Sequence, residues 1–262
     1  MPAARLKAVL SPKVMIVAKS ILFSLVFYLN TIVMLIAALP TFLMPRTAIL
    51  RVAQAWAEVS LVLLRVIVGT RVEYRGLDRI PEGGLLVASK HQSFADIHAL
   101  LPKLRDPTFI LKRELTWIPI WGWFTIKAGM IPVDRSRGAS AIADMNRRAR
   151  DEVERGRQIL IYPEGTRRAP GAEPAYRQGV AHLYRSLDVP CLPVALNSGL
   201  YWPRRKLMLQ PGTIIVEFLP PIPPGLDREE FMHVLKTSIE TASNRLLEEA
   251  MRPAGYTGPD GI

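Results

Sequence analysis

The sequence predicts an α/β fold, in which a mixed, largely parallel sheet flanked by helices follows an N-terminal membrane-embedded two-helix segment. From residue 71 onward, short apolar runs alternate with helical stretches, as in a sheet covered by helices on both faces. The stretch from Ser20 to Pro45 carries no charge at all, which is typical of a segment that enters a bilayer. We therefore divide the chain into a membrane-associated helical segment (1–69), an α/β domain (70–252) and a flexible tail (253–262).

The first apolar segment, Ile21 to Leu39, is long enough to cross a hydrocarbon core. About 20 helical residues rising 1.5 Å each match a core of about 30 Å. Asn30 and Thr31 interrupt its middle and Pro40 closes it. The segment is too long for the apolar region of a cleaved signal peptide, and no small-residue cleavage site follows.

The second segment, Leu50 to Val68, has the pattern of an amphipathic helix, with apolar residues at steps of three or four. The short connection between the two segments predicts an antiparallel pair. Two arrangements remain open: a spanning helix with an interfacial partner, or a hairpin that dips into one leaflet. A buried pair of soluble helices is the alternative to both.

Seven apolar runs in the rest of the chain predict strands, and two long periodic stretches predict helices. The strands are expected at 72–74, 85–88, 108–111, 130–133, 159–162, 192–196 and 213–218. The helices are expected at 140–154 and 227–251, each with one apolar face.

The end of the run 85–89 places a base and a carboxylate close together, in His91-Gln92-Ser93-Phe94-Ala95-Asp96. Ser93 has the position of an N-cap, so these residues read as a strand end, a turn and a first helical turn. Two residues five apart on one continuous helix would point about 140° away from each other. Across a turn, His91 and Asp96 can pair.

Such a pair can perform general base catalysis. Histidine accepts a proton near neutral pH, and a carboxylate on its other nitrogen fixes the tautomer and steadies the imidazolium. We predict His91 as the base and Asp96 as the residue that orients it, with no serine or cysteine nucleophile required. Taken alone, the motif is more often an ordinary loop histidine beside a helix cap.

Four further blocks follow in order: Lys112 to Leu115, Gly129 to Arg135, Tyr162 to Arg167 and Val189 to Val194. Together with the His91 block, they resemble the glycerolipid acyltransferase family, specifically the 1-acyl-sn-glycerol-3-phosphate (lysophosphatidic acid) acyltransferases, over residues 85–197. The resemblance implies a membrane-bound enzyme that moves a fatty acyl chain from acyl-CoA or acyl-carrier protein to the sn-2 hydroxyl of 1-acylglycerol 3-phosphate, giving phosphatidic acid. It also favours the hairpin arrangement of the two N-terminal helices.

The resemblance assigns substrate binding to the P-E-G-T-R block, because in the family this block binds the glycerol phosphate. Fixed cations elsewhere would serve the same phosphate. The predicted substrate-binding residues are therefore Lys112, Arg135, Glu164, Gly165, Thr166 and Arg167. Arg168, where a small residue is more usual, and Pro132 depart from the family pattern.

The amino-acid composition limits the kinds of partner and cofactor that the protein could bind. The formal charge of +11 favours an anionic partner, which could be a lipid surface, a phosphorylated substrate or a nucleic acid. Nucleic acid is disfavoured because the basic residues form no stripe interleaved with aromatic ones. The single Cys191 lies in apolar surroundings typical of a core residue. No Cys/His spacing indicates a metal site, so we expect no metal and no cofactor beyond the acyl carrier.

Two alternatives to the function implied by the resemblance remain open. The same chemistry could act on another acceptor, such as a lyso-ornithine lipid or glycerol 3-phosphate, and the chain could instead be a catalytically silent membrane lipid-binding module. We expect the inner (cytoplasmic) membrane, with the active site on the cytoplasmic side, because the acyl carriers are cytosolic. The aromatic run Trp117 to Phe124 could line an acyl groove, lie at the membrane interface or pack in the core.

Overall fold

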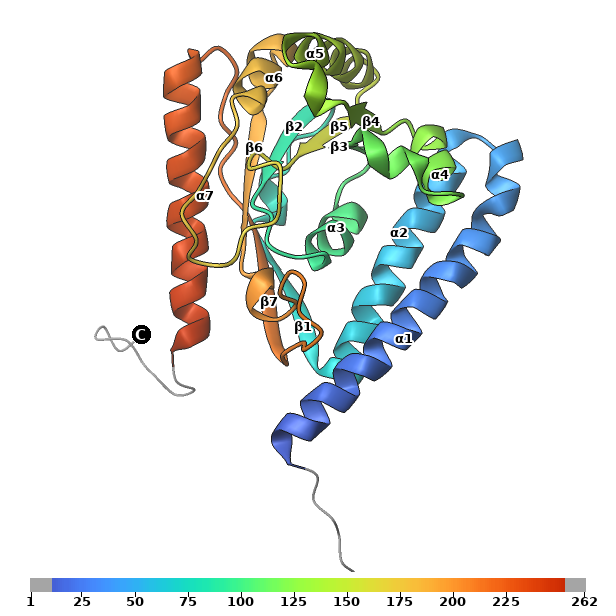
Figure 1. Cartoon of the computed structure of the whole chain (residues 1–262). Helices are drawn as coiled ribbons and strands as arrows, with labels where there is room; N and C mark the ends of the chain where they lie inside the picture. Colours follow the sequence, from blue (N-terminus) through green and yellow to red (C-terminus); the bar gives the residue numbers. More distant parts are fainter. Residues whose placement is uncertain (1–10, 253–262) are drawn as a thin grey trace, which may run out of the picture.

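The computed structural model describes residues 11–252 (Figure 1), so the predicted tail at 253–262 lies outside the described residues. Each of the seven predicted strand runs overlaps one strand of a single seven-stranded sheet. The strands are β1 (Thr70–Arg75), β2 (Leu85–Ser89), β3 (Pro107–Lys112), β4 (Ile131–Val133), β5 (Gln158–Ile161), β6 (Cys191–Leu196) and β7 (Gly212–Phe218).

The sheet is mixed and largely parallel, as predicted. Its strand order is β1-β7-β6-β2-β5-β3-β4, and only the β6–β7 pair is antiparallel. The carboxyl ends of β2, β3, β4, β5 and β6 therefore meet at one edge. In open α/β sheets, that edge is where ligands bind.

Helices cover both faces of this sheet. They are α3 (Ala95–Leu100), α4 (Trp121–Lys127), α5 (Ala139–Glu154), α6 (Gly179–Leu187) and α7 (Arg228–Met251). Strand β2 shows how the faces are shared: Leu85 and Val87 pack in the cluster with α3, whereas Leu86 and Ala88 pack in the cluster with α5, α6 and α7. This alternation follows from the two-residue period of a strand. Figure 1 shows α7 on one side of the sheet and the N-terminal helices on the other.

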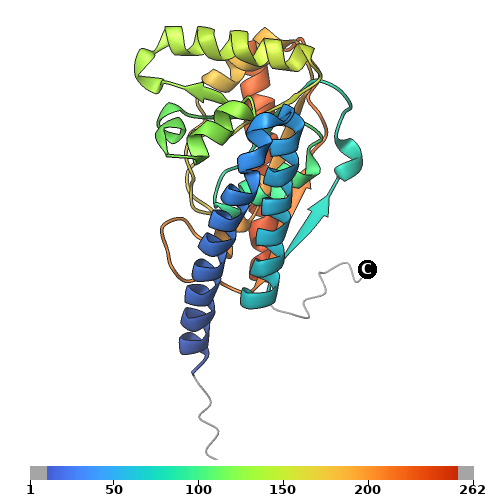
Figure 2. The ribbon, with the colours of Figure 1, turned by 90° about the vertical axis from the view of Figure 1, so that its right-hand side faces the viewer.

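The N-terminal helices form the expected antiparallel pair. Helix α1 (Pro12–Ala38) is joined through a 3₁₀ turn (Leu39–Leu43) to α2 (Arg46–Leu63), which continues as one π turn (Leu64–Val68). Helix α1 begins well before the predicted apolar stretch, because Ser11 caps it and a proline at the first position suits a helix start. Figure 2 shows the two helices side by side along the α/β domain.

The polar midpoint of α1 binds α2. Asn30 Nδ2 donates to Ser60 Oγ at 3.3 Å, and Trp56 Nε1 donates to Thr31 Oγ1 at 3.1 Å. The opposite side of α1 is apolar and exposed; Leu25, for example, is 66% exposed. Both helical stretches, 12–43 and 46–68, are candidate membrane spans by length and composition. The polar interruption in the sequence thus serves helix pairing.

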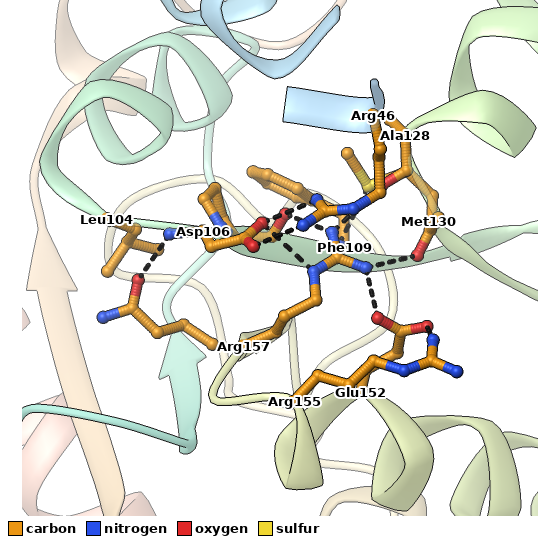
Figure 3. Close-up of polar contacts among 12 residues, drawn as sticks. Arg46, Leu104, Asp106, Phe109, Ala128, Met130, Glu152, Arg155 and Arg157 are labelled. Carbon is orange, nitrogen blue, oxygen red and sulfur yellow. Dashed lines mark hydrogen bonds and ion pairs between the residues drawn. The ribbon is translucent and has the colours of Figure 1, made fainter. Parts of the chain in front are cut away.

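A buried arginine ties α2 to the sheet (Figure 3). Arg157, directly before β5, donates from Nε to Asp106 Oδ1 at 3.1 Å and from Nη1 to Glu152 Oε2 at 2.5 Å. Asp106 also accepts two hydrogen bonds from Arg46, the first residue of α2. The Arg157 guanidinium donates further to three backbone carbonyls, those of Pro107, Ala128 and Gly129. This cluster fixes the start of β3, the end of α4 and the start of α2 relative to one another.

Candidate active site

His91 and Asp96 make the contact that their spacing predicts. His91 follows β2 and Asp96 lies in the first turn of α3, so the chain turns between them. His91 Nδ1 lies 2.8 Å from Asp96 Oδ2. Because a carboxylate can only accept, this contact places the imidazole proton on Nδ1 and leaves Nε2 free to accept a proton.

The Asp96 carboxylate is fully buried and held by several donors. Its Oδ2 also accepts the backbone N–H groups of Gln92 (2.8 Å) and Ser93 (2.9 Å), and its Oδ1 accepts the hydroxyl of Ser198. The prediction of Ser93 as the N-cap is wrong: α3 begins at Ala95 with Phe94 in the cap position, and Ser93 Oγ accepts from Ala95 N. The Asp96 carboxylate accepts from two N–H groups that precede the helix, and these contacts fix its aim at His91.

Tyr162, which follows β5, fixes the plane of the imidazole. Its ring stacks on His91 with centroids 3.7 Å apart and an interplanar angle of 14°. Burial, together with the nearby Asp96 carboxylate, raises the pKa of the Tyr162 hydroxyl well above its ordinary value. The hydroxyl therefore stays protonated near neutral pH.

A pocket of about 790 Å³ opens at the carboxyl edge of the sheet and brings the predicted residues together. His91 lines it, and Asp96 lies behind His91. The pocket is lined by all six predicted substrate-binding residues, namely Lys112, Arg135, Glu164, Gly165, Thr166 and Arg167. Its size is within the range of small-molecule sites.

These six residues differ in what their side chains do. The Glu164 carboxylate is turned inward and is fully buried, with Oε2 at 3.3 Å from Lys90 Nζ. Gly165 has φ +67°, which favours glycine, and its N–H already donates to Tyr162 O, so that N–H is not free for an oxyanion. Arg135 Nη1 donates to the Gly165 carbonyl at 2.9 Å. Arg135 thus binds the backbone of the P-E-G-T-R block.

The side chains of Lys112, Thr166 and Arg167 are less buried than that of Glu164. The Lys112 side chain is 53% exposed and pairs with Glu114 at 2.8 Å. Thr166 is exposed. Arg167 is partly buried, and no hydrogen bond or salt bridge from its side chain exists within residues 11–252. Burial, and then the nearby charges of Arg204 and Arg205, lower the pKa of the Arg167 guanidinium.

The rest of the pocket is apolar and runs between the α/β domain and the N-terminal helices. The aromatic run contributes Trp121 and Phe124 to its wall, whereas Trp117 and Trp123 are more than half exposed. Helices α1 and α2 supply Met34, Leu35, Ala38, Ile49, Val52, Ala53 and Trp56. The pocket therefore joins a cationic end beside His91 to a long apolar arm.

Sequence reasoning missed four residues around this site: Lys90, Ser198, Arg177 and Arg204. Ser198 follows the end of β6 and so reaches the same edge of the sheet as His91, a relation that needs the strand order. Arg177 and Arg204 line the pocket from loops outside every quoted block. Their positive charge was the only signal in the sequence, and it does not distinguish them from the other members of the chain's 34 lysines and arginines.

Two other expectations concern Cys191 and metals. Cys191 is a buried, free thiol in β6, and burial raises its pKa, so the expectation of a core residue is confirmed. Across residues 11–252, no group of three or more His, Cys, Asp or Glu side chains could hold a metal ion. Independence from metals and cofactors stays a prediction.

A partly buried base held by a carboxylate, beside Arg167 and an apolar arm, can deprotonate a hydroxyl on an amphipathic, anionic molecule. General base catalysis of acyl transfer to a hydroxyl is one reaction that such a site would support. Residues 71–197 match the family model described as Acyltransferase, so nearly half of the chain is similar to that family.

Individual relatives of the chain have a more specific name than the family model. The 1-acyl-sn-glycerol-3-phosphate acyltransferase of Pseudomonas aeruginosa is 36% identical over 165 residues, which are 63% of this chain and 64% of that protein. The human 1-acyl-sn-glycerol-3-phosphate acyltransferase alpha is 30% identical over 169 residues, 63% of this chain and 60% of that protein. The match thus spans less than two thirds of the length of these relatives.

A solved structure shares the fold. The 1-acyl-sn-glycerophosphate (LPA) acyltransferase PlsC from Thermotoga maritima has a TM-score of 0.74 at 22% identity and covers 92% of this chain and 99% of that chain. The coverage includes most of the chain beyond residues 71–197. The arrangement of N-terminal helices and mixed sheet is therefore that of PlsC.

Proposed function

We propose that this protein is a membrane-associated acyltransferase that transfers a fatty acyl chain from a thioester donor to the sn-2 hydroxyl of 1-acylglycerol 3-phosphate. The observation that carries the proposal is one pocket that holds the His91–Asp96 pair, the cationic end with Arg135 and Arg167, and an apolar arm. A lysophospholipid has a matching hydroxyl, phosphate and acyl chain. The relatives named 1-acyl-sn-glycerol-3-phosphate acyltransferase support this acceptor.

The chemistry is a direct transfer. His91 Nε2 accepts the hydroxyl proton as the oxygen attacks the thioester carbonyl, and Asp96 steadies the imidazolium. The tetrahedral intermediate collapses with cleavage of the C–S bond, and the departing thiolate takes the proton from His91. An ester and a free thiol result, and the base is restored. No covalent acyl-enzyme forms, since no serine or cysteine is paired with His91 among the described residues.

We further propose that the donor is acyl-CoA or acyl-carrier protein, and that the protein works at the cytoplasmic face of the inner membrane. The two candidate membrane helices support attachment to a bilayer. The cytoplasmic side is supported by the chemistry, because these thioesters are cytosolic.

The test measures transfer from labelled acyl-CoA and from labelled acyl-carrier protein to lysophosphatidic acid, using the full chain in detergent. Wild type should form phosphatidic acid, and His91→Ala should not. His233→Ala is the matched control, because His233 is exposed on α7, away from the pocket, and should leave the rate unchanged. Product formation that survives His91→Ala would remove His91 as the base.

The acceptor is tested separately. Lyso-ornithine lipid, glycerol 3-phosphate and lysophosphatidic acid are offered to wild type and to Arg167→Ala. A phosphate acceptor should lose much of its affinity in the variant, whereas a zwitterionic acceptor should lose little. If no acceptor is consumed but lipid binding persists, a silent lipid-binding module is the better description.

A further inference from the structure

The segment after β6 adds a cation to the pocket from outside the region that matches the family model. Arg204 lies in the connection between β6 and β7, beyond residue 197, and lines the same pocket as His91 and Arg167. Its Nη1 donates to the backbone carbonyl of Arg167 at 2.8 Å. Arg204 therefore lies directly against the P-E-G-T-R block, although 37 residues separate the two arginines.

This connection is anchored to α1, so the position of Arg204 is fixed. Trp202 packs edge-on against Phe23, with ring centroids 5.1 Å apart, and Leu209 N donates to Ser20 Oγ at 2.9 Å. Arg205 then has φ +59°, a turn in the left-handed region. The turn leaves Arg205 exposed while Arg204 stays partly buried in the pocket wall.

The charges at this end of the pocket are not balanced within the described chain. Neither Arg167 nor Arg204 has a carboxylate at ion-pair distance, whereas the adjacent Arg168 faces Glu164 at 3.7 Å. Asp96 is the acid whose charge acts on Arg167, and four donors already occupy its oxygens. Arg204 Nε is buried and has no hydrogen-bond partner within residues 11–252. Two partly buried like charges with spare donors would be stabilised by an anion that offsets their repulsion.

We propose that Arg204 is a second binding residue for the acceptor's phosphate, forming with Arg167 a two-arginine clamp. The inference rests on the proposed function, because it assigns the clamp to the phosphate of the lysophospholipid. Two guanidinium groups match the several oxygens of a phosphate dianion better than one, and each can donate in a planar fork. Arg204 keeps the P-E-G-T-R backbone in place through Nη1 while its remaining donors hold the phosphate.

The test compares Arg204→Gln with Arg205→Gln, which removes the same charge from the exposed neighbouring position. With lysophosphatidic acid as acceptor, Arg204→Gln should raise KM by about 10- to 100-fold, as expected for a lost charged hydrogen bond, and leave kcat within about threefold. Arg205→Gln should change neither. Arg204→Lys restores the charge without the fork and should recover part of the loss.

Binding of glycerol 3-phosphate and of inorganic phosphate, followed by calorimetry, tests the clamp without turnover. Wild type should bind glycerol 3-phosphate, and Arg204→Gln should weaken that binding by a factor similar to the rise in KM. Weaker binding of inorganic phosphate as well would locate the effect on the phosphate rather than on the lipid. Wild type that binds neither ligand would overturn the clamp.

Other outcomes would also decide whether Arg204 binds the phosphate of the acceptor. Equal losses in Arg204→Gln and Arg205→Gln would mean that the whole loop senses anionic membrane lipid, and would overturn the clamp. A fall in kcat with unchanged KM would show that Arg204 acts on the chemical step rather than on binding of the phosphate, and would overturn the clamp. If wild type binds glycerol 3-phosphate through Arg204 but forms no phosphatidic acid, the clamp stands and the proposed acceptor reaction fails.

Discussion

Replacing Lys90 by methionine should both destabilise the protein and disturb the active site. Lys90 directly precedes His91, and its side chain is only 3% exposed. Its Nζ lies 2.7 Å from Glu240 Oε1 of α7 and 3.3 Å from Glu164 Oε2 of the P-E-G-T-R block. Tyr176 adds a hydrogen bond to the same Glu240 oxygen at 2.8 Å. One ammonium thus connects the strand end beside His91, the P-E-G-T-R block and the C-terminal helix.

The magnitude follows from what Lys90→Met leaves behind. Glu164, with a fully buried side chain, would keep only the Ala175 N–H at 3.3 Å and Arg168 at 3.7 Å. Removing one partner of a buried ion pair leaves an uncompensated charge and costs about 3 to 5 kcal/mol. For a protein of this size, that loss corresponds to a fall of about 6 to 20 °C in Tm. The catalytic rate should fall as well, because Glu164 positions the loop that carries Arg167.

The assay is thermal and urea unfolding of the full chain in detergent, followed by circular dichroism. Lys236→Met is the matched control, because Lys236 is exposed on α7 and its removal should cost less than about 1 kcal/mol. Adding Glu240→Leu to Lys90→Met should recover part of the stability, since the second change removes one orphaned charge. Loss of stability by Lys90→Met that equals the loss in the Lys236 control would refute the buried ion-pair account.

Three further changes probe other parts of the molecule. Arg157→Met should cost about 3 to 5 kcal/mol of unfolding free energy, because it strips buried carbonyls and Asp106 of their donor. Ser198→Ala should lower kcat roughly 10-fold at unchanged KM, because Asp96 loses the donor that holds its second oxygen. Burial lowers the pKa of His98 from 6.5 to about 4, so the neutral form is favoured in the folded state. Stability is therefore full above pH 6.5 and should fall by about 3 kcal/mol between pH 6.5 and 4, a loss that His98→Phe should remove.

Each of these has a clear contrary result. Urea unfolding of Arg157→Met within about 1 kcal/mol of wild type would mean that the cluster contributes no net stability. A rise in KM with unchanged kcat in Ser198→Ala would show that the serine acts on binding. If wild type and His98→Phe lost the same stability as the pH falls from 6.5 to 4, groups other than His98 would cause the acid sensitivity.

The sequence was sufficient for the strands and for the catalytic pair because both are local. Each strand is a short apolar run bounded by glycine, proline or polar residues, so its place does not depend on its neighbours. His91 and Asp96 are five residues apart, and a single turn decides whether they meet. The positions of Arg135 and Arg167 could be predicted for a related reason. Both residues follow strands whose carboxyl ends lie at one edge of a parallel sheet.

Contacts between distant segments could not be predicted in the same way. The Lys90–Glu240 pair spans 150 residues, and Ser198 lies 102 residues from Asp96. Each depends on the strand order, in which β6 lies beside β2 although β3, β4 and β5 come between them in the chain. Apolar periodicity carries no information on that order. The position of Arg204 depends in addition on the packing of Trp202 in the same loop against Phe23 of α1.

The packing of the N-terminal helices makes them part of the catalytic unit. Phe27 and Trp56, from α1 and α2, share a buried cluster with Val87 of β2. The same two helices supply one wall of the pocket that His91 lines. A division of the chain at residue 69 therefore separates two segments of sequence but cuts through one hydrophobic core. Under the proposed function, the same two helices would provide both the membrane attachment and the apolar arm, so an acceptor lipid in the bilayer would lie next to the wall that receives its chain.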